Sequence, residues 1–342
     1  MLGNATPTTF RKSSSTPSTS SMHTTTLPHS YTLRSTTRLS GIPPIASQAE
    51  PGLVGFRNLG NTCYMNASLQ CLLRRSRFRS LLQHTDSRSL IGSLRDLTVQ
   101  MSTSRTIVSP TSLQDLLGPP WSGREQQDAV EFILFLIDGL DTELSRLGLQ
   151  LTPSKADAPS YSAISSMFTL TTNSIITCLG CKTKTKMAEK FIVLPLTVPE
   201  APSTLERCIE DFLSTERFSG SFACEKCRTH TDAVKNLEIS SLPDILLIAL
   251  KRFRWTGKRP SKNTTMISCN HNLVIEEKSY RLVGTIQHRG NTVDSGHYTA
   301  HIRHHREWFR INDEVVQEIG SDEVVEGNTY VLVFSRVYPG SR

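Results

Sequence analysis

Two pairs of cysteines constrain the fold of this chain more than any other sequence feature. Cys178-Leu-Gly-Cys181 and Cys224-Glu-Lys-Cys227 are CxxC sequences with 42 residues between them. Each pair can present two thiolates to one metal ion, and four thiolates complete the tetrahedral shell of Zn²⁺. With no position left for water, one such ion would be structural and would fasten two distant turns together. A redox dithiol would occur once, at the start of a helix, so the two pairs favour a metal site.

The composition and the cysteine usage indicate a reducing compartment. The chain of 342 residues has eight cysteines and no apolar leader, which favours thiol chemistry over disulfides and a cytoplasmic or nuclear location.

No apolar run approaches the roughly 18 residues of a membrane span, so we expect no membrane partner. The net charge of +7 is spread along the chain instead of forming a basic helix, which disfavours nucleic-acid binding. We expect a monomer.

The first fifty residues differ in composition from the rest. Residues 1–50 contain 21 Ser or Thr, four Lys or Arg and one acidic residue, with almost no periodic apolar pattern. Such a segment cannot bury enough apolar surface to offset its ordering entropy, so we predict a disordered tail. A Ser-rich, acid-poor leader also fits a mitochondrial transit peptide, but no clear amphipathic helix is present. The folded domain is therefore expected over residues 51–338.

The hydrophobic period changes about half-way along this domain. From Gln126 to Leu147, apolar residues recur at helical spacing with acidic residues between them, which predicts an amphipathic helix. Beyond a connection that contains two prolines, short β-like runs are separated by Pro, Gly and Asn. The predicted strands are Phe191–Val198, Ile245–Arg252, Tyr280–Gln287, His297–Arg303 and Thr329–Ser335. Helices followed by strands indicate the α+β fold class.

Cys63 is the candidate nucleophile. Gly60-Asn61-Thr62 precedes it and a helical stretch follows, so backbone amides and the helix dipole would favour its thiolate form. A cysteine is more often a small buried hydrophobe, a description that suits Cys71 in the same helix. An acyl-transfer site also needs donors for the oxyanion. The backbone N–H of Cys63 and the side-chain amide of Asn58 or Asn61 are candidates, and composition does not choose between the two asparagines.

A hairpin supplies the candidate base. If His304-His305 is its turn, His297 falls directly opposite Asn312. Opposite residues of antiparallel strands have Cβ atoms about 4.5–5.5 Å apart, so Asn312 would hydrogen-bond the imidazole and orient it. A slip of one residue would place Asp313 opposite instead. His301 shares the strand face of His297 but lies further along, and we expect it to be structural.

Blocks of sequence around these candidates resemble a known family. Residues 52–73, GLVGFRNLGNTCYMNASLQCLL, resemble the cysteine box of ubiquitin-specific proteases, and residues 280–302, YRLVGTIQHRGNTVDSGHYTAHI, resemble their histidine box. The similarity continues in the family's order through GREQQDAVEFILFL (123–136), both CxxC pairs, SLPDILLIALKRF (241–253), WFRINDEVV (308–316) and NTYVLVFSR (328–336). The blocks span residues 52 to 336.

The resemblance implies a fold and an activity. The fold would be a papain-like cysteine protease core, with a thumb at about residues 51–160 and a palm with zinc fingers at about 161–338. The activity would be that of a deubiquitinase, which hydrolyses isopeptide or peptide bonds after the C-terminal glycine of ubiquitin. Ubiquitin and ubiquitinated proteins are then the expected partners, and one structural Zn²⁺ is the expected cofactor.

The resemblance also implies roles for individual residues. It assigns Cys63 as nucleophile, His297 as base, Asn312 as the third member, Asn58 instead of Asn61 as oxyanion donor and Asp313 as a supporting acid. It places ubiquitin-tail contacts at Asp128, Glu131, Gly296 and Tyr298, and the zinc ligands at Cys178, Cys181, Cys224 and Cys227. Asn312 departs from the Asp of many members, although Asn suits a thiolate–imidazolium pair, as in papain-like enzymes.

Three alternatives stand beside this interpretation. A catalytically silent ubiquitin-binding scaffold would lack the Cys, the His or the oxyanion Asn, and none of them is missing. An isopeptidase for another ubiquitin-like modifier would keep the same triad with a different binding surface. A zinc-dependent interaction module would lose its fold with a chelator and show no Cys63 reactivity.

Overall fold

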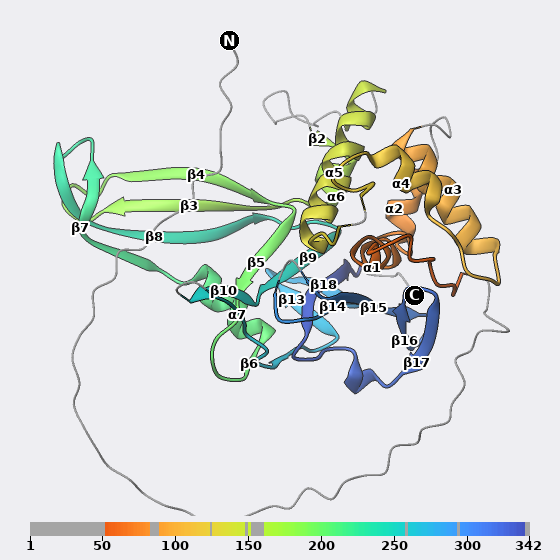
Figure 1. Ribbon diagram of the computed structural model, residues 1–342. Helices are drawn as coiled ribbons and strands as arrows, with labels where there is room; N and C mark the ends of the chain where they lie inside the picture. The colour runs from red at the N-terminus through yellow and green to blue at the C-terminus, as the bar shows by residue number, and fades with distance from the viewer. Residues whose placement is uncertain are drawn as a thin grey trace, which may run out of the picture. The chain divides into compact units, whose positions relative to one another are not determined.

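Helices occupy mainly the first half of the described chain, and strands the second (Figure 1). The computed structural model describes residues 52–82, 89–123, 125–147, 150–151, 161–256, 259–292 and 295–338. All of them belong to one unit, Pro43–Arg342. The predicted tail, residues 1–50, lies outside the described residues. The order of helices and then strands confirms the α+β fold class.

The helical part contains one helix that the sequence predicted closely. The helices are α1 (Cys63–Leu72), α2 (Ser76–Leu81), α3 (Leu90–Thr103), α4 (Thr111–Leu117), α5 (Ala129–Arg146) and α6 (Ala163–Phe168). The predicted Gln126–Leu147 helix is α5, which begins at Ala129 because the Asp128 side chain caps it by accepting from the N–H groups of Val130 and Glu131. None of the helices in the described ranges is long and apolar enough to cross a membrane.

A large, mostly antiparallel sheet forms the centre of the strand-rich part. Its strand order is β17-β16-β15-β14-β18-β9-β5, and β13 also pairs with β14. The bounds are β5 (Val193–Thr197), β9 (Ile245–Lys251), β13 (Asn272–Ile275), β14 (Lys278–Arg289), β15 (His297–His304), β16 (Glu307–Asn312), β17 (Val315–Ile319) and β18 (Thr329–Arg336). The five predicted strands correspond to β5, β9, β14, β15 and β18, with ends within two residues of the predicted ones.

Strand β9 shows why part of this sheet reads as a continuous apolar run. Successive side chains of a strand point to opposite faces. Ile245, Leu247 and Ala249 join the core that contains α1 and α5, whereas Leu246, Ile248 and Leu250 join a second core on the other face. Both faces of β9 are therefore covered, which removes the polar half of the usual alternation.

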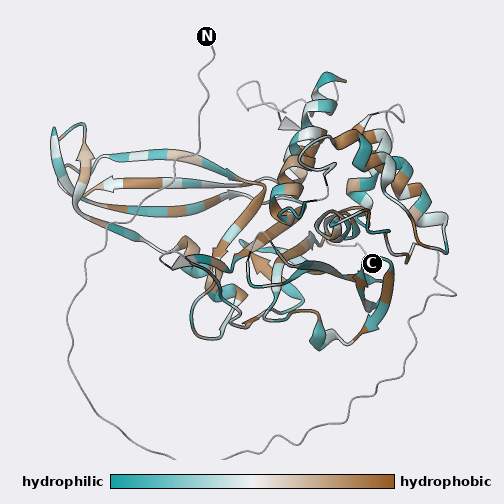
Figure 2. Cartoon of the chain, in the orientation of Figure 1, coloured by the Kyte–Doolittle hydropathy of each residue, from teal (hydrophilic) through white to brown (hydrophobic). Residues whose placement is uncertain are grey.

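A second, four-stranded sheet carries the two CxxC pairs, where zinc-tied hairpins were expected, but its strands were not among the predicted ones. Its order is β4-β3-β8-β7, formed by β3 (Leu170–Cys178), β4 (Lys184–Phe191), β7 (Glu216–Cys224) and β8 (Thr229–Ser241). Most residues of β4 and β7 are exposed, and Figure 2 shows hydrophilic and hydrophobic residues interspersed along this sheet. With few buried positions, its strands lack the periodic apolar signal that reveals a strand in sequence.

Short elements complete the described chain. They are β1 (Gln150–Leu151) with β2 (Tyr161–Ser162), β6 (Ser203–Thr204) with β12 (Ile267–Ser268), β10 (Phe253–Thr256) with β11 (Arg259–Lys262), helix α7 (Leu205–Leu213) and the 3₁₀ helix Ser321–Glu323.

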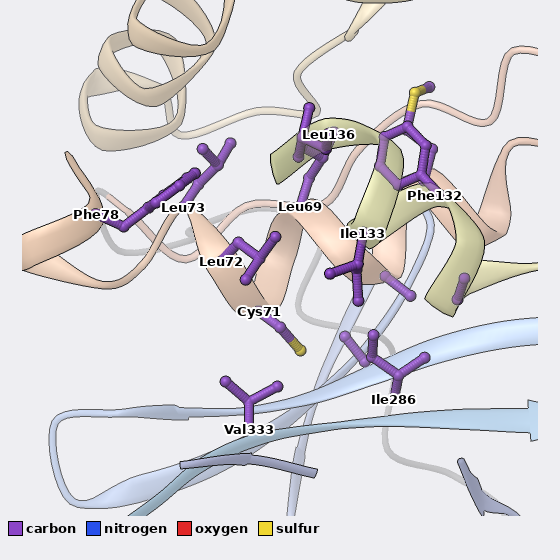
Figure 3. Close-up of a cluster of buried hydrophobic side chains, with 14 of the residues drawn as sticks. Leu69, Cys71, Leu72, Leu73, Phe78, Phe132, Ile133, Leu136, Ile286 and Val333 are labelled. Atoms are coloured by element: carbon purple, nitrogen blue, oxygen red, sulfur yellow. The ribbon is translucent and has the colours of Figure 1, made fainter. Parts of the chain in front are cut away.

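Helix α1 lies between the two parts of the fold. All ten of its residues are buried. Figure 3 shows Leu69 and Leu72 of α1 among Phe132 and Ile133 of α5, with Cys71 above the sheet residue Val333. Burial raises the pKa of Cys71 to about 12, which confirms its predicted role as a small core residue. Helix α1 packs on β14 and on β15, the strand that begins at His297. This packing holds Cys63, the first residue of α1, beside that strand.

Candidate active site and metal centre

A tight loop delivers Cys63 to the first position of α1. Asn61 has a left-handed φ of 56°, and the Oδ1 atom of Asn58 accepts hydrogen bonds from the N–H groups of Gly60 and Thr62 at 3.0 and 3.2 Å. The Thr62 hydroxyl in turn accepts from the N–H of Leu59 at 2.9 Å. These contacts hold the loop that precedes α1, and Cys63 is the first residue of that helix, as the sequence predicted.

His297 lies in contact with Cys63 and Asn312. Its Nε2 atom is 2.6 Å from Oδ1 of Asn312. A hydrogen bond with Cys63 is the main cause that raises the pKa of His297 to about 9, against an opposing effect of burial, and the bond to Asn312 raises it further. Because Nε2 donates to Asn312, the other ring nitrogen is left to exchange a proton with Cys63.

The register of the β15–β16 hairpin, which carries His297 and Asn312, differs from the predicted one. β15 pairs with β16 through His304↔Glu307 and Ala300↔Ile311, so the turn is His305-Arg306 and not His304-His305. The predicted direct pairing of His297 with Asn312 is therefore wrong. The paired part of the strands ends at Ala300, and Asn312 reaches His297 diagonally. The contact survives because a displacement of two positions leaves a side chain on the same face of a strand.

Asp313 connects Asn58, in the loop before α1, with Asn66 of α1 itself. It has a left-handed φ of 48° and is 8% exposed. Its two carboxylate oxygens accept hydrogen bonds from the side-chain amides of Asn58 and Asn66, each at 2.8 Å. Its charge also contributes to the raised pKa of His297. An amide nitrogen carries two N–H groups, so the hydrogen bond to Asp313 uses one of those of Asn58 and orients its side chain.

Gln126 is a site residue that the sequence analysis missed. Its side-chain amide pairs with the backbone of Gly296: Nε2 donates to the carbonyl oxygen at 2.7 Å, and the Gly296 N–H donates to Oε1 at 2.8 Å. This pair joins the loop before α5 to the residue that precedes His297. The position of Gln126 directly before the QDAVE segment could have drawn attention to it, but only the fold shows that Gly296 is its partner.

Gly296 also lies against the buried ring of His288. A Cβ atom at position 296 would come within 2.3 Å of the His288 Nε2 atom, so a side chain does not fit there. Burial and then the nearby charge of Lys262 lower the pKa of His288 to about 4, so this ring is neutral. The packing thus gives a physical reason for glycine directly before the candidate base.

The predicted ubiquitin-tail contacts differ in their surroundings. Asp128 is 8% exposed, and besides capping α5 it accepts hydrogen bonds from the hydroxyl groups of Tyr330 at 2.7 Å and Tyr298 at 3.3 Å. Glu131, one helical turn later, is exposed, and its pKa is raised by partial burial and by Asp128. Asp128 therefore joins α5 to β15 and β18, whereas Glu131 faces solvent.

The two CxxC pairs come together at the tips of the four-stranded sheet. Cys178 and Cys181 lie at the β3–β4 turn, and Cys224 and Cys227 at the β7–β8 turn. The four sulfur atoms lie within 4.8 Å of one another, with 3.8 Å between Cys178 and Cys227 and 3.6 Å between Cys181 and Cys224. Sulfurs at about 2.3 Å from a tetrahedral Zn²⁺ are about 3.8 Å apart, so the cluster fits this ion.

The two turns share one backbone conformation. The residue after each pair, Lys182 or Arg228, has a left-handed φ of 61° or 56°. The N–H of each donates to the carbonyl of the first cysteine, at 2.9 Å to Cys178 and 2.8 Å to Cys224. The same turn built twice, from segments far apart in the chain, brings four thiol groups together as a metal site requires.

Comparisons with known proteins agree with this geometry. A family model described as ubiquitin carboxyl-terminal hydrolase matches residues 54–334. The chain belongs to the ubiquitin carboxyl-terminal hydrolase family. It is 30% identical over 346 residues to ubiquitin carboxyl-terminal hydrolase 2 of Rattus norvegicus, with 86% of this chain and 56% of that protein covered. The Gallus gallus protein of the same name is 30% identical over 362 residues, with 87% and 98% covered.

Chains in solved structures share the fold of this chain. A chain of the SAGA Ubp8/Sgf11/Sus1/Sgf73 DUB module bound to ubiquitin aldehyde matches with a TM-score of 0.70 and 24% identity, covering 87% of this chain and 72% of that chain. The module bound to monoubiquitin matches with a TM-score of 0.70 and 25% identity over the same shares. This chain thus spans a little over half of the rat relative and most of the Ubp8-module chain.

Proposed function

We propose that this protein is a deubiquitinase of the cysteine type. Its substrates would be protein conjugates in which the C-terminal glycine of ubiquitin is joined to an amine. The observation that carries the proposal is the contact of His297 with both Cys63 and Asn312, at the start of a buried helix and in a chain of this family. The ubiquitin-bound forms of structures with the same fold support ubiquitin as the modifier.

The first half-reaction forms a thioester. The Cys63 thiolate attacks the glycine carbonyl carbon, and the charge that develops on the oxygen is stabilised by the N–H of Cys63 and by Asn58. His297, protonated as its raised pKa favours, gives its proton to the leaving lysine amine as the C–N bond breaks. Asp313 keeps Asn58 in place through the 2.8 Å hydrogen bond.

The second half-reaction releases ubiquitin. Neutral His297 takes a proton from water, which attacks the thioester carbonyl. The C–S bond breaks, the carboxylic acid of ubiquitin forms and releases its proton to solvent, and the Cys63–His297 pair returns to its starting protonation. Asn312 holds the imidazole orientation throughout through its 2.6 Å contact with Nε2.

The division into subdomains is part of this proposal. We assign α1 to α6 to the thumb, the large sheet to the palm and the four-stranded sheet to the fingers. The four clustered cysteines would hold one Zn²⁺, which closes both turns of the fingers and supplies no chemistry to the reaction. Glu131 would contact the basic tail of ubiquitin from the exposed face of α5.

Covalent labelling with ubiquitin that carries a C-terminal electrophile tests the activity. Wild-type protein and Cys63→Ala are compared by intact mass, with other ubiquitin-like modifiers that carry the same electrophile in parallel. A single ubiquitin adduct that is lost in Cys63→Ala is the expected result. An adduct with another modifier only would reassign the substrate, and no adduct on folded protein would leave the silent scaffold as the better interpretation.

A further inference from the structure

A basic pocket lies at the far ends of the two elements that carry Cys63 and His297. It has a volume of about 400 Å³ and is lined by Arg74, Arg75, Arg79, Arg303, His304 and His305 among others. The first three follow the C-terminal end of α1 and enter α2, and the others lie at the end of β15 and its turn. We call this hollow the arginine pocket.

The charged side chains in the described lining of the arginine pocket are all basic. None of the described residues that line it is acidic. Arg74 donates to neutral acceptors, the side-chain oxygen of Gln70 at 2.8 Å and the backbone oxygen of Gly52. Arg77 provides the contrast, because it lies on α2 together with Arg79 but pairs with Asp244.

Two donors in the arginine pocket are buried and without a partner in the described part of the chain. They are the Nε atoms of Arg75, which lies between α1 and α2, and of Arg303 in β15. Burial lowers the pKa of Arg74 to about 9 and that of Arg75 to about 10, and repulsion from neighbouring arginines adds to the shift. A buried donor without an acceptor costs free energy, and like charges in proximity add to that cost.

The donor set matches phosphate chemistry. A guanidinium group offers up to five N–H donors in a planar fork that suits phosphate oxygens. Four such groups offer more donors than one phosphate group with three strong acceptor oxygens can use. The described lining of the pocket includes no Phe, Tyr or Trp on which a base would stack, which argues against a nucleic-acid strand.

We propose that the arginine pocket binds a small molecule that carries two or more phosphate groups. The site is separate from Cys63 and does not depend on the proposed deubiquitinase activity. Binding would neutralise the clustered arginines and provide acceptors for the buried Nε atoms. It would therefore stabilise the folded protein in proportion to ligand concentration.

Isothermal calorimetry and thermal unfolding with sodium pyrophosphate test the proposal. Orthophosphate and sulfate are run in parallel at matched ionic strength. The variants Arg75→Gln and Arg303→Gln each remove one donor fork, and Arg217→Gln, on the exposed face of β7, removes the same charge elsewhere. We expect pyrophosphate to bind wild type and Arg217→Gln equally and each pocket variant about tenfold more weakly, as for one lost charge-assisted contact.

The unfolding temperatures of the variants without added anion show whether weaker binding results merely from a destabilised fold. Removing Arg75 relieves repulsion, so Arg75→Gln should unfold at a temperature no lower than wild type while binding more weakly. Equal pyrophosphate affinity in wild type and both pocket variants would overturn the proposal, and so would the absence of any thermal shift. Orthophosphate or sulfate binding as tightly as pyrophosphate would overturn the assignment to a polyphosphorylated ligand.

Discussion

The acidity of His297 depends on residues from two distant parts of the chain. The hydrogen bond with Cys63 comes from the start of α1, and the bond to Asn312 comes from the end of β16. The pKa of about 9 lies above the ordinary value of 6.5, so the folded protein binds this proton more tightly than the unfolded chain. The resulting stability is fully present below pH 6.5 and is lost as the pH rises through about 9.

At the scale of one residue, we predict that Cys63→Ala lowers the pKa of His297. The substitution removes the largest cause of the upward shift and leaves burial, which lowers the value. The imidazole signals can be titrated by NMR, with His301, whose pKa burial lowers to about 4, as an internal reference. The pH dependence of unfolding between 6.5 and 9 should weaken in the same variant. An unchanged His297 titration in Cys63→Ala would contradict the contact between the two side chains.

At the scale of an element, the N-terminal end of α5 and the loop before it contact the start of β15 at two points. Asp128 accepts from Tyr298 and Tyr330, and Gln126 pairs with the backbone of Gly296. Both contacts link the helical part to the sheet beside His297. We infer that α5 and the loop before it position His297, and that Gln126 is a positioning residue.

We predict that Gln126→Ala slows alkylation of Cys63 by iodoacetamide by about ten- to a hundredfold, because a small displacement of His297 weakens its contact with the thiolate. The loss of two backbone contacts should lower the unfolding free energy by only about 1–3 kcal/mol. Iodoacetamide makes the measurement independent of ubiquitin binding. Gln127→Ala, at a half-buried neighbouring position, is the matched control. The pH profile of alkylation should shift in Gln126→Ala. A drop in stability with an unshifted pH profile would show that Gln126 has a purely structural role.

At the scale of the whole molecule, the metal centre and the candidate active site belong to different sheets. The cysteine cluster joins the tips of β3–β4 and β7–β8, whereas Cys63 and His297 lie where α1 meets β15. Loss of the metal should therefore affect the four-stranded sheet first. The site of the thiol chemistry relies on the larger sheet and its helical layer.

We predict one zinc ion per chain by native mass spectrometry, and its loss in Cys224→Ser but not in Cys269→Ser, a half-buried cysteine outside the cluster. Zinc affinity should fall as the pH is lowered, because the ligands must be deprotonated. Alkylation of Cys63 by iodoacetamide should persist in Cys224→Ser. Equal zinc content in the two variants would argue against the cluster as the metal site, and loss of alkylation would show that the two sheets do not fold independently.

Local sequence determined those features whose signal lies within a short segment. The α5 helix and strands β5, β9, β14, β15 and β18 carry apolar periodicity, and Cys63 at the start of a helix follows from the loop before it. The CxxC spacing alone indicated four metal ligands, since each pair fixes its own turn. The resemblance to a family added the roles of individual residues, which periodicity does not contain.

Only the tertiary structure decided how these segments meet. The hairpin turn lies at His305-Arg306, and the predicted register was wrong because a turn without Gly or Asn gives little sequence signal. The pairing of Gln126 with Gly296 and the convergence of arginines from the α1–α2 connection, α2 and β15 were invisible for a different reason. Each depends on contacts between residues far apart in the chain, and a local pattern records which face of an element is apolar but not which partner it meets.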